Sequence, residues 1–345
     1  MLRRHFLAVI ATTPLVAATR AVDLVSQSNV IDMLGLLTLD WPLLSRWQSA
    51  PGKFGEADFQ KLRASGIDVF HPAVAFDTRP YSVTLDWFAK WNGFIARYPQ
   101  YFLRVDDSRS LASAKAQGKI GIILGMQDAN HLRSVDDVDN FYRMGQRLTQ
   151  LTYNSVNRLG AGCKAAKDSG LTQFGAEVVA RMNSVGMAID VSHCGERTTL
   201  DAIEASKKPV LITHSNCRAV AGPVARCKSD EVIRAAARKG GVIGLTSVRH
   251  FVRAKDPVTI EDALDHFDHA VGVAGIEHVG VGSDLDLDGR DRRTGPLLYD
   301  IAGLNRTQRM YELTDGLIRR GYTNEQIGLM LGGNFQRALQ QIWLT

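Results

Sequence analysis

The sequence predicts a single α/β domain folded as a (β/α)8 barrel, on three observations. From about Val30 onward, short apolar runs rich in β-branched residues alternate with amphipathic stretches, and eight such pairs follow one another without a break in composition. The 345 residues, 45% of them hydrophobic and 22% charged, suffice for one large core. Polar residues suited to chemistry stand at the ends of several predicted strands, which is where barrel enzymes place their sites.

Each of the eight predicted strands is a short apolar run that ends in polar residues. The strands are Val30–Leu37, Ile67–Phe76, Lys119–Gln127, Leu148–Asn154, Ala188–His193, Pro209–His214, Val242–Val248 and His278–Asp284. Helices are expected to begin at Thr198 and Asp230, and to cover Thr259–Val273, Thr307–Arg320 and Asn334–Ile342. Thr259 and Asp262 have the spacing of a helix cap.

An open, doubly wound sheet has the same alternation of strands and helices. A nucleotide-binding sheet of that kind needs a glycine-rich turn after its first strand, and the chain has Leu34-Gly35-Leu36-Leu37 there. The eight units and the polar strand ends therefore favour the barrel.

The first residues have the features of an export signal. Arg3-Arg4 precede an apolar stretch and small residues that end near Ala21, so residues 1–21 are expected to be a twin-arginine signal and residues 22–345 the single domain. The apolar run is too short to span a bilayer, and no later segment reaches about 18 uninterrupted apolar residues. We therefore expect a soluble periplasmic protein without a membrane span in its mature chain.

Charge and cysteine content limit the partners and the covalent bonds. The formal net charge of +5 is scattered and lacks the clustered basic and aromatic residues of a nucleic-acid surface, which excludes nucleic acid as a partner. An oxidising compartment allows one or two disulfides, but the spacing of the cysteines leaves their pairing open. The cysteines are Cys163, Cys194, Cys217 and Cys227.

Three predicted strands end in residues that suit a metal or acid–base site. His193 ends the fifth strand, His214 the sixth and Asp284 the eighth. One histidine at a strand end usually has a structural role, but two on adjacent strands with a carboxylate on a third favour a metal-binding or catalytic site. Neutral imidazoles suit zinc, and a carboxylate can orient water, accept its proton or complete a three-ligand site.

Around these residues the sequence resembles the membrane (renal) dipeptidase family. The matching segments are Phe174-Gly175 through Met187, Asp190-Val191-Ser192-His193, Thr213-His214-Ser215-Asn216, Gly240-Gly241-Val242-Ile243-Gly244, His278-Val279-Gly280-Val281-Gly282-Ser283-Asp284 and Leu331-Gly332-Gly333-Asn334-Phe335. The resemblance covers nearly all of the mature chain. It implies a barrel with two zinc ions bridged by a glutamate and a hydroxide, hydrolysis of dipeptides, an arginine that binds the substrate carboxylate, and a homodimer in many members.

Carried over one residue at a time, the resemblance assigns His193 and His214 as the ligands of one metal ion and Asp284 as the proton shuttle. Arg226 stands where the family has its substrate-binding arginine, although the surrounding loop departs from the usual His-Pro-Arg pattern. Tyr153 replaces the family's histidine on the oxyanion side, and its hydroxyl still offers a hydrogen bond.

The ligands of the second metal ion are missing. Leu34 and Leu36 occupy the positions of the family's His-x-Asp pair, and Gln127 occupies that of the bridging glutamate. Leucine cannot ligate a metal, and an amide is a weak neutral ligand where two cations need a shared negative charge. Because uncompensated buried cations cost several kcal/mol each, the sequence predicts one zinc ion in preference to two.

The leading hypothesis is a metal-dependent hydrolase that cleaves a dipeptide or another small amide with metal-activated water. In this hypothesis Asp284 handles the proton, Arg226 binds the substrate carboxylate, and Tyr153 or Gln127 polarises the carbonyl. Its rival is a non-hydrolytic family member, either a metal-free enzyme or a small-molecule binding protein, that kept the pocket without the two-metal chemistry. A purely structural protein is the third alternative.

Other polar and aromatic residues are expected to have mainly structural roles. Four near strand ends either form local hydrogen bonds or supplement the site: Asp32, His71, Asp128 and His131. Three histidines surround the seventh strand's loop and the following helix, where a solvated helix face explains the last two: His250, His266 and His269. Two aspartates either bind a substrate amine or cap a turn: Asp286 and Asp288. Four tryptophans pack in the core or line a pocket: Trp41, Trp47, Trp87 and Trp91.

Overall fold

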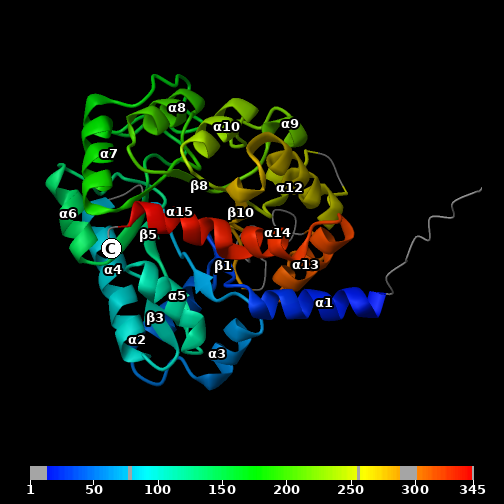
Figure 1. Cartoon of the computed structure of the whole chain (residues 1–345). Coiled ribbons are helices and arrows are strands. Elements are labelled where there is room, and N and C mark those ends of the chain that lie inside the picture. Colours follow the sequence, from blue (N-terminus) through cyan, green and yellow to red (C-terminus); the bar gives the residue numbers. More distant parts are fainter. Residues whose placement is uncertain (1–13, 77–79, 255–256, 288–300, 344–345) are drawn as a thin grey trace, which may run out of the picture.

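A computed structural model describes residues 14–76, 80–254, 257–287 and 301–343 of the chain and confirms the α/β barrel (Figure 1). Asp288 lies outside the described residues. The strands are β1 (Ile31–Asp32), β2 (Val69–Phe70), β3 (Phe102–Arg104), β4 (Ile120–Ile122), β5 (Leu124–Met126), β6 (Gln146–Gln150), β7 (Ala188–Asp190), β8 (Val210–Ser215), β9 (Ile243–Leu245) and β10 (Val279–Val281).

Parallel strands fill eight positions around the barrel. β1 pairs with β2 and β2 with β4, while β5 pairs with β6 and the ladder continues in order through β7, β8 and β9 to β10. The two runs join because β4 and β5 are one extended segment interrupted only at Ile123. The circuit closes between β10 and β1, where Met33 N donates to Val281 O at 3.0 Å and Asp284 N donates to Leu34 O at 2.8 Å.

Most of the observed strands are shorter than the predicted ones, although β8 is as long as its prediction. β1 covers only Ile31–Asp32, and the predicted strand Lys119–Gln127 is split into β4 and β5. Gln127, His193 and Asp284 follow the observed strands, whereas His214 lies within β8. β3 was not predicted, because Phe102–Arg104 is a short strand that pairs with β4 alone, outside the circuit.

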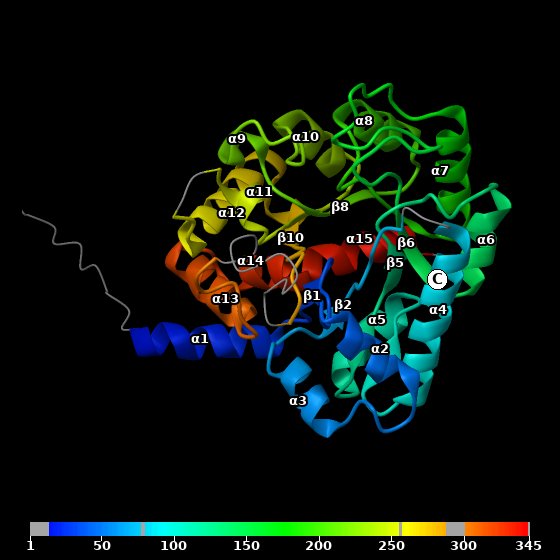
Figure 2. The same cartoon turned by 180° about the vertical axis from the view of Figure 1, so that it is seen from behind.

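Helices surround the barrel in both views (Figures 1 and 2). They are α1 (Pro14–Gln27), α2 (Trp41–Ser49), α3 (Glu56–Arg63), α4 (Pro80–Arg97), α5 (Ser108–Ala116), α6 (Asp136–Arg143), α7 (Gln173–Val185), α8 (Glu196–Ala205), α9 (Arg218–Ala221), α10 (Asp230–Arg238), α11 (Arg249–Val252), α12 (Ile260–Ala274), α13 (Arg309–Arg319), α14 (Asn324–Gly328) and α15 (Asn334–Ile342), with short turns η1 (Ile276–His278) and η2 (Leu329–Gly333). The predicted cap of α12 is confirmed, since Thr259 Oγ1 accepts from Asp262 N while Asp262 Oδ2 accepts from Thr259 N.

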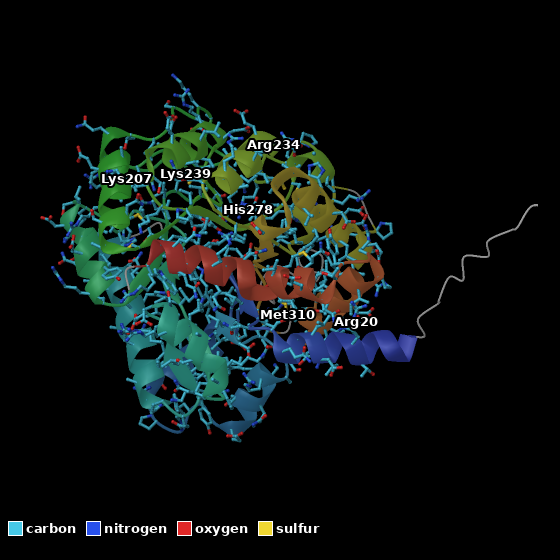
Figure 3. All side chains as sticks on the ribbon, in the orientation of Figure 1. Arg20, Lys207, Arg234, Lys239, His278 and Met310 are labelled. Atoms are coloured by element: carbon cyan, nitrogen blue, oxygen red, sulfur yellow. The ribbon has the colours of Figure 1, made fainter. Side chains whose placement is uncertain are left out.

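One end of the barrel is closed by the C-terminal helices. α15 crosses the strands (Figure 1), and its Phe335 and Leu339 pack in one buried cluster with strand residues such as Ile31 and Val69. Basic side chains, among them Lys207, Arg234 and Lys239, lie around the same face (Figure 3). Because α15 closes this end, the strand ends that carry the predicted site residues open at the other.

The first helix packs against the body of the protein. α1 lies beside α13, where Leu24 and Val25 are buried, and Arg20 Nε donates to Asn324 Oδ1 at 2.9 Å. This helix runs across the predicted signal boundary at residue 21, and the division into signal and domain stays a prediction. None of the described helices has the length and apolar character needed to cross a membrane.

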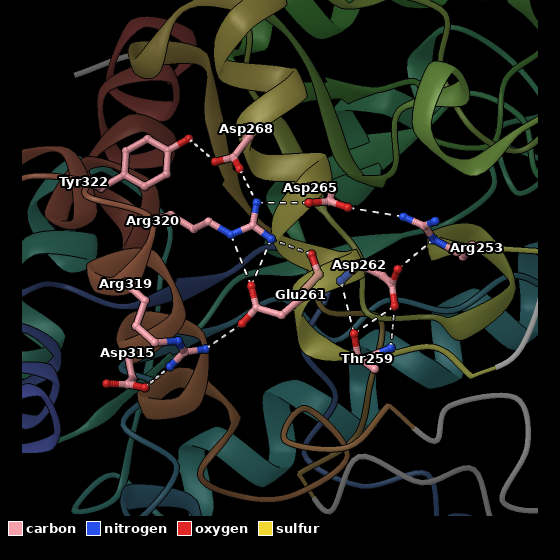
Figure 4. A network of polar contacts seen from close by, with 10 residues as sticks. All are labelled: Arg253, Thr259, Glu261, Asp262, Asp265, Asp268, Asp315, Arg319, Arg320 and Tyr322. Carbon is pink, nitrogen blue, oxygen red and sulfur yellow. Dashed lines mark hydrogen bonds and ion pairs between the residues drawn. The ribbon is translucent and has the colours of Figure 1, made fainter. Parts of the chain in front are cut away.

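An ion-pair network joins α12 to the end of α13 (Figure 4). Arg320 contacts Glu261 at 2.9 Å, Asp265 at 3.0 Å and Asp268 at 2.5 Å. Tyr322 donates from its hydroxyl to Asp268 at 2.8 Å. A network of this kind holds two outer helices in one register more firmly than a single exposed pair does.

Candidate active site

The two predicted metal-binding histidines lie together at the open end of the barrel. His193 follows β7, His214 lies within β8, and both side chains are almost fully buried. His193 Nε2 and His214 Nε2 are 3.0 Å apart. The distance places both nitrogens within reach of one small cation, for which zinc–nitrogen bonds of about 2.0–2.1 Å are usual.

The remaining ring nitrogens fix the tautomer of each histidine. His193 Nδ1 lies 3.0 Å from Asn154 Oδ1, and His214 Nδ1 lies 2.8 Å from Thr213 Oγ1. The Thr213 hydroxyl donates its own proton to Asp190 Oδ2 at 2.7 Å, so its oxygen accepts from His214. Both imidazoles therefore carry their proton on Nδ1 and present a bare Nε2 lone pair to the same point, as metal-binding histidines do.

A buried carboxylate organises this side of the mouth. Asp190, at the end of β7, accepts from Ser192 N at 2.9 Å and Ser192 Oγ at 2.5 Å. It also accepts from Thr213 N at 3.0 Å, and Ser192 Oγ in turn accepts from His214 N at 3.0 Å. Asp190 thus sets the orientation of His214 through Thr213. No role was predicted for Asp190, Thr213 or Asn154, although each lies close in sequence to a site histidine or to Tyr153.

Two glycines allow the neighbouring strands to approach Thr213. A Cβ atom at Gly244 would lie 2.1 Å from Thr213 O, and one at Gly282 would lie 1.8 Å from the same oxygen. Any larger residue at either position would displace the strand that carries His214. Gly244 and Gly282 therefore allow the chain to pack closely against the strand that carries His214.

Burial and nearby cations lower the pKa of both imidazoles. For His193, burial is the largest cause, followed by Arg226, His214, Lys228 and Lys164, and together they hold the pKa well below its usual value. Burial and Arg226 lower the pKa of His214 in the same way. Neutral imidazole is the form that binds metals, so the pair is ready to ligate at neutral pH.

The histidine pair is the part of the mouth whose donors suit a metal ion. Two bare lone pairs that face each other at 3.0 Å repel unless a cation lies between them. In the family's other half-site Leu34 and Leu36 are buried apolar side chains. Within the described ranges, no three His, Cys, Asp or Glu side chains converge on one point. A metal ion would therefore be held by His193 and His214, with water or substrate completing its coordination.

The Arg226 side chain joins the two segments that carry the site histidines. Its guanidinium donates from Nη1 to Ser192 O at 2.7 Å and from Nη2 to His214 O at 2.6 Å. Among the described residues, its Nε–H has no acceptor. Phe251 covers the group, with Arg226 Cζ 5.4 Å from the ring centroid. The predicted substrate role stays a prediction, for which Nε–H and the second N–H of each Nη are not used by these two bonds.

A second buried cation lies next to Arg226. Lys228 Nζ donates to Cys194 O at 2.8 Å and to Thr199 Oγ1 at 3.2 Å. Burial is the main reason that its pKa is lowered to about 8. Two cations beside the histidines make this part of the mouth electropositive, which suits an anionic substrate group. The sequence analysis did not assign Lys228 a role.

Tyr153 and Gln127, the two predicted carbonyl-polarising residues, have different surroundings. The Tyr153 ring stacks on His193, with centroids 4.2 Å apart and planes inclined by 25°. Gln127 Nε2 donates to Ala73 O at 2.9 Å, and Gln127 O accepts from Gln150. Tyr153 is thus in contact with the histidine pair, whereas the Gln127 amide is engaged with the chain after β2.

Asp284 combines an unusual backbone with a shifted pKa. Its φ of 57° is the only positive value among described residues other than glycine. Burial and the charge of Asp32 raise its pKa to about 7, against the lowering effect of Arg226. Strained backbone of this kind persists where the surroundings enforce it, and a carboxyl group that titrates near neutrality is suited to proton transfer.

The acidic and histidine residues on the β1 and β2 side form internal contacts. Asp32 accepts from Ser283 N at 2.8 Å and pairs with Arg309 at 3.3 Å, with both side chains fully buried. His71 Nδ1 donates to Met33 O at 2.7 Å. Asp32 is therefore part of the closure between β10 and β1, as a structural reading predicts. His71 Nε2 has no partner in the described part of the chain.

Several other histidines have structural roles. His131 is buried between Asp128 O and Gln146 Oε1, at 3.1 and 3.2 Å, and burial lowers its pKa to about 4. The expectation of a solvated face was wrong for His266, which is buried and lies 2.8 Å from Val252 O. This contact holds α12 against α11 and explains the error, because helical periodicity alone does not reveal a second covering helix. His269 is half-exposed and pairs with Asp230 at 2.8 Å.

The remaining candidates lie apart from the histidine pair. His250 is exposed on α11, and Asp286 O accepts from Arg309. All four cysteines are free thiols, and the three buried ones have pKa values raised by burial. Of the four tryptophans of the early helices, Trp47 and Trp91 are buried in the core, while Trp41 and Trp87 line a cavity. Both of the expected roles, core packing and lining a pocket, therefore occur.

Comparison with known proteins identifies the family. The model of the membrane dipeptidase family (peptidase family M19) matches residues 18–344. An uncharacterized dipeptidase of Schizosaccharomyces pombe is 33% identical over 244 residues, which cover 68% of this chain and 56% of that protein. Dipeptidase verJ of Clonostachys rogersoniana is 30% identical over 65% of this chain and 56% of its own. The matches thus span little more than half the length of these curated relatives.

A solved structure supports the fold. An amidohydrolase from Pseudomonas aeruginosa superposes with a TM-score of 0.83 at 26% identity and covers 94% of this chain and 99% of its own. The family match over nearly the whole chain confirms the resemblance inferred from the strand-end motifs. The chain belongs to the membrane dipeptidase family.

Proposed function

We propose that this protein is a zinc-dependent hydrolase that cleaves a dipeptide or another small amide, with one metal ion held by His193 and His214. The observation that carries the proposal is the pair of bare Nε2 atoms 3.0 Å apart, each fixed by a hydrogen bond at Nδ1. Membership of a family whose curated relatives are named dipeptidases supports the reaction class.

The site residues divide the remaining work. When bound, zinc polarises the amide carbonyl and makes water a stronger nucleophile. Arg226 offers Nε–H to the substrate carboxylate, in the electropositive part of the mouth that it shares with Lys228. Tyr153, stacked on His193, offers its hydroxyl to the carbonyl oxygen.

Asp284 moves the proton in this proposal. Burial raises its pKa to about 7, so the carboxyl group can both accept and donate a proton near neutral pH. The ionised form accepts a proton from the attacking water, and the protonated form donates it to the nitrogen of the departing amine. The same group therefore acts first as base and then as acid.

Metal analysis combined with a dipeptide library tests the proposal. We expect about one zinc ion per chain, hydrolysis of a subset of dipeptides, loss of activity on chelation and recovery when zinc is returned. Protein without zinc that binds a dipeptide and does not cleave it would instead support the non-hydrolytic alternative. Two zinc ions per chain would contradict the one-metal site.

Export and assembly are separate proposals. The paired arginines at Arg3-Arg4 and the apolar stretch after them support twin-arginine export to the periplasm. Replacing both arginines with lysine should leave the protein in the cytoplasmic fraction. A homodimer, as expected from the family resemblance, would appear as twice the mass of the chain in light scattering.

A further inference from the structure

Three cations lie around His193 at the open end of the barrel. Arg226 and Lys228 follow β8 and are buried, whereas Lys164 lies in the loop after β6 and is exposed. β7, which precedes His193, pairs with β6 on one side and with β8 on the other, so the loops that carry the cations flank the histidine. Burial is the largest cause of the lowered pKa of His193, and all three cations lower it further.

Backbone contacts attach Lys164 to the histidine site. Lys164 N donates to Asn154 O at 2.9 Å, and Cys163 N, one residue earlier, donates to His193 O at 2.7 Å. Asn154 Oδ1 in turn accepts from His193 Nδ1 at 3.0 Å. These contacts fix the start of the Lys164 side chain beside the mouth. Because the residue is exposed and its stem is flexible, its ammonium group is accessible to a molecule that enters there.

The hydrogen bonds of the two buried cations run to uncharged acceptors. These acceptors are three backbone carbonyl oxygens and one hydroxyl: Ser192 O and His214 O for Arg226, and Cys194 O and Thr199 Oγ1 for Lys228. Such acceptors solvate a cation without cancelling its charge. Burying a cation without an anion costs free energy, and an anion that binds beside it offsets that cost.

The nearby acids compensate part of this positive charge. Asp190 and Glu196 both interact electrostatically with Lys228. Glu196 also pairs with Arg218 at 2.5 Å, so its charge is already matched. Among the described residues on this side of the mouth, the three cations and the one remaining carboxylate leave two positive charges in excess. The zinc ion proposed for the histidine pair adds to this excess.

A substrate with one carboxylate supplies one of the two negative charges that match this excess. The proposed function places the α-carboxylate of the substrate's C-terminal residue at Arg226. Lys164 is the exposed cation of the three, and its loop and that of Arg226 lie on opposite sides of His193. An aspartate or a glutamate at the C-terminal position carries a second carboxylate close to the first. The charges on this side of the mouth therefore suit an acidic C-terminal residue.

We propose that the protein prefers dipeptides whose C-terminal residue is acidic, with the α-carboxylate at Arg226 and the side-chain carboxylate at Lys164. The inference rests on the proposed function, which it deepens by naming the substrate class. Ala-Glu is then cleaved with a kcat/KM about tenfold higher than that of Ala-Gln, which has the same shape without the charge. Glu-Ala, which carries its acidic side chain at the other end, has no such advantage over Gln-Ala.

Charge changes at Lys164 test the proposal without touching the histidine pair. Lys164→Met should lower the ratio of the kcat/KM values of Ala-Glu and Ala-Gln at least about threefold, and Lys164→Glu should bring it below one. Lys167→Met is the control, because Lys167 is exposed in the same loop three residues later, and it should keep the wild-type ratio. Both lysines are exposed, so neither change removes a core group. A ratio that survives Lys164→Met, or that falls equally in Lys167→Met, overturns the proposal.

A binding measurement keeps this inference separate from the proposed function. The probes are reduced-amide analogues of Ala-Glu and Ala-Gln, titrated calorimetrically into the full chain in buffer that contains zinc. Tighter binding of the acidic probe that is lost in Lys164→Met and kept in Lys167→Met supports the inference, even if no dipeptide is cleaved. Equal binding of the two probes, or an acidic preference that persists in Lys164→Met, overturns it, even if hydrolysis is observed.

Discussion

The polar groups on the two sides of the barrel mouth have different surroundings. On the side of β7 and β8, His193 and His214 present bare nitrogen atoms to a common point, and buried cations stand beside them. On the side of β1 and β5, the positions that carry metal ligands in the resembled family hold Leu34, Leu36 and Gln127. One half of the mouth is therefore arranged for a ligand, whereas the other pairs its buried acid internally and leaves His71 Nε2 without a partner among the described residues.

The difference shows how the barrel can stay folded where the metal-ligand positions of the resembled family hold other residues. On the β1 side, the carboxylate of Asp32 is neutralised by Arg309 and bonded to Ser283, and the amide of Gln127 is bonded to Ala73 O. These contacts leave no charge that would require a cation. On the β7 side, the buried acid Asp190 orients His214 through Thr213.

The largest effect is expected from removing a ligand on the β7 side. His193→Asn should weaken zinc binding at least about 100-fold and reduce hydrolysis to background, because one imidazole alone cannot hold the ion. Metal content after dialysis and dipeptide assays measure both effects. The matched control is His131→Asn, a buried histidine with both ring nitrogens hydrogen-bonded. Zinc retained in His193→Asn would remove the basis of the comparison.

The next effect concerns the acid on the β1 side. Arg309→Met leaves Asp32 buried without its cation and should lower the free energy of unfolding by about 3–5 kcal/mol. Zinc content should not change. Arg319→Met is the control on the same helix, because its ion pairs are exposed and contribute about 0–1 kcal/mol. Denaturant titration gives both values, and a loss of zinc in Arg309→Met would mean that Asp32 belongs to the metal site.

The third prediction concerns Asp284, which follows β10 between the β1 side and the β7 side of the mouth. Asp284→Asn should lower kcat about 100-fold with zinc retained, and should remove the rise of wild-type activity as pH increases through about 7. Asparagine tolerates the positive φ of this position, which alanine does not. Activity profiles from about pH 5.5 to 8.5 measure the effect. An unchanged profile in the variant would assign the titration to another group.

The same variant should be more stable than the wild type at high pH. The folded pKa of Asp284, about 7, lies above its ordinary value of 3.8, so the folded state binds this proton more tightly than the unfolded state. The wild type therefore loses stability as pH rises from about 4 to 7, and the neutral asparagine does not. Melting temperatures should coincide near about pH 4 and favour Asp284→Asn near about pH 8.5.

The sequence alone predicted the barrel and the histidine pair, because both depend on regular features. Strand–helix alternation is visible in apolar periodicity, and His193 and His214 end adjacent predicted strands. The supporting contacts were not predictable in this way. Thr213 and Asn154 act through the directions of single side chains, which periodicity does not encode.

The errors have the same origin. His266 was placed on a solvated face because α12 is amphipathic, but the short α11 covers it. The sequence also left open whether the early tryptophans pack in the core or line a pocket. Trp41 and Trp87 come from helices whose relative placement depends on the whole barrel, so their cavity could not be predicted from the sequence. Local patterns predict elements and strand ends, whereas contacts between distant elements need the fold.

The smallest expected effect comes from returning one charge to the β1 side. Gln127→Glu preserves the shape of the side chain, loses the donor to Ala73 O, and places a carboxylate in a mouth that already holds Arg226 and Lys228. Zinc affinity should rise by about tenfold, equivalent to about 1.4 kcal/mol, while the stoichiometry stays at one ion because Leu34 and Leu36 still provide no ligands.

Competition with a chromogenic chelator measures the affinity, and elemental analysis measures the stoichiometry. Gln150→Glu, a change of the same type at the neighbouring buried amide, controls for charge alone. A second zinc ion bound by Gln127→Glu would contradict this prediction. It would mean that Leu34 and Leu36 do not prevent metal binding on the β1 side, and that the two sides of the mouth differ by one missing carboxylate.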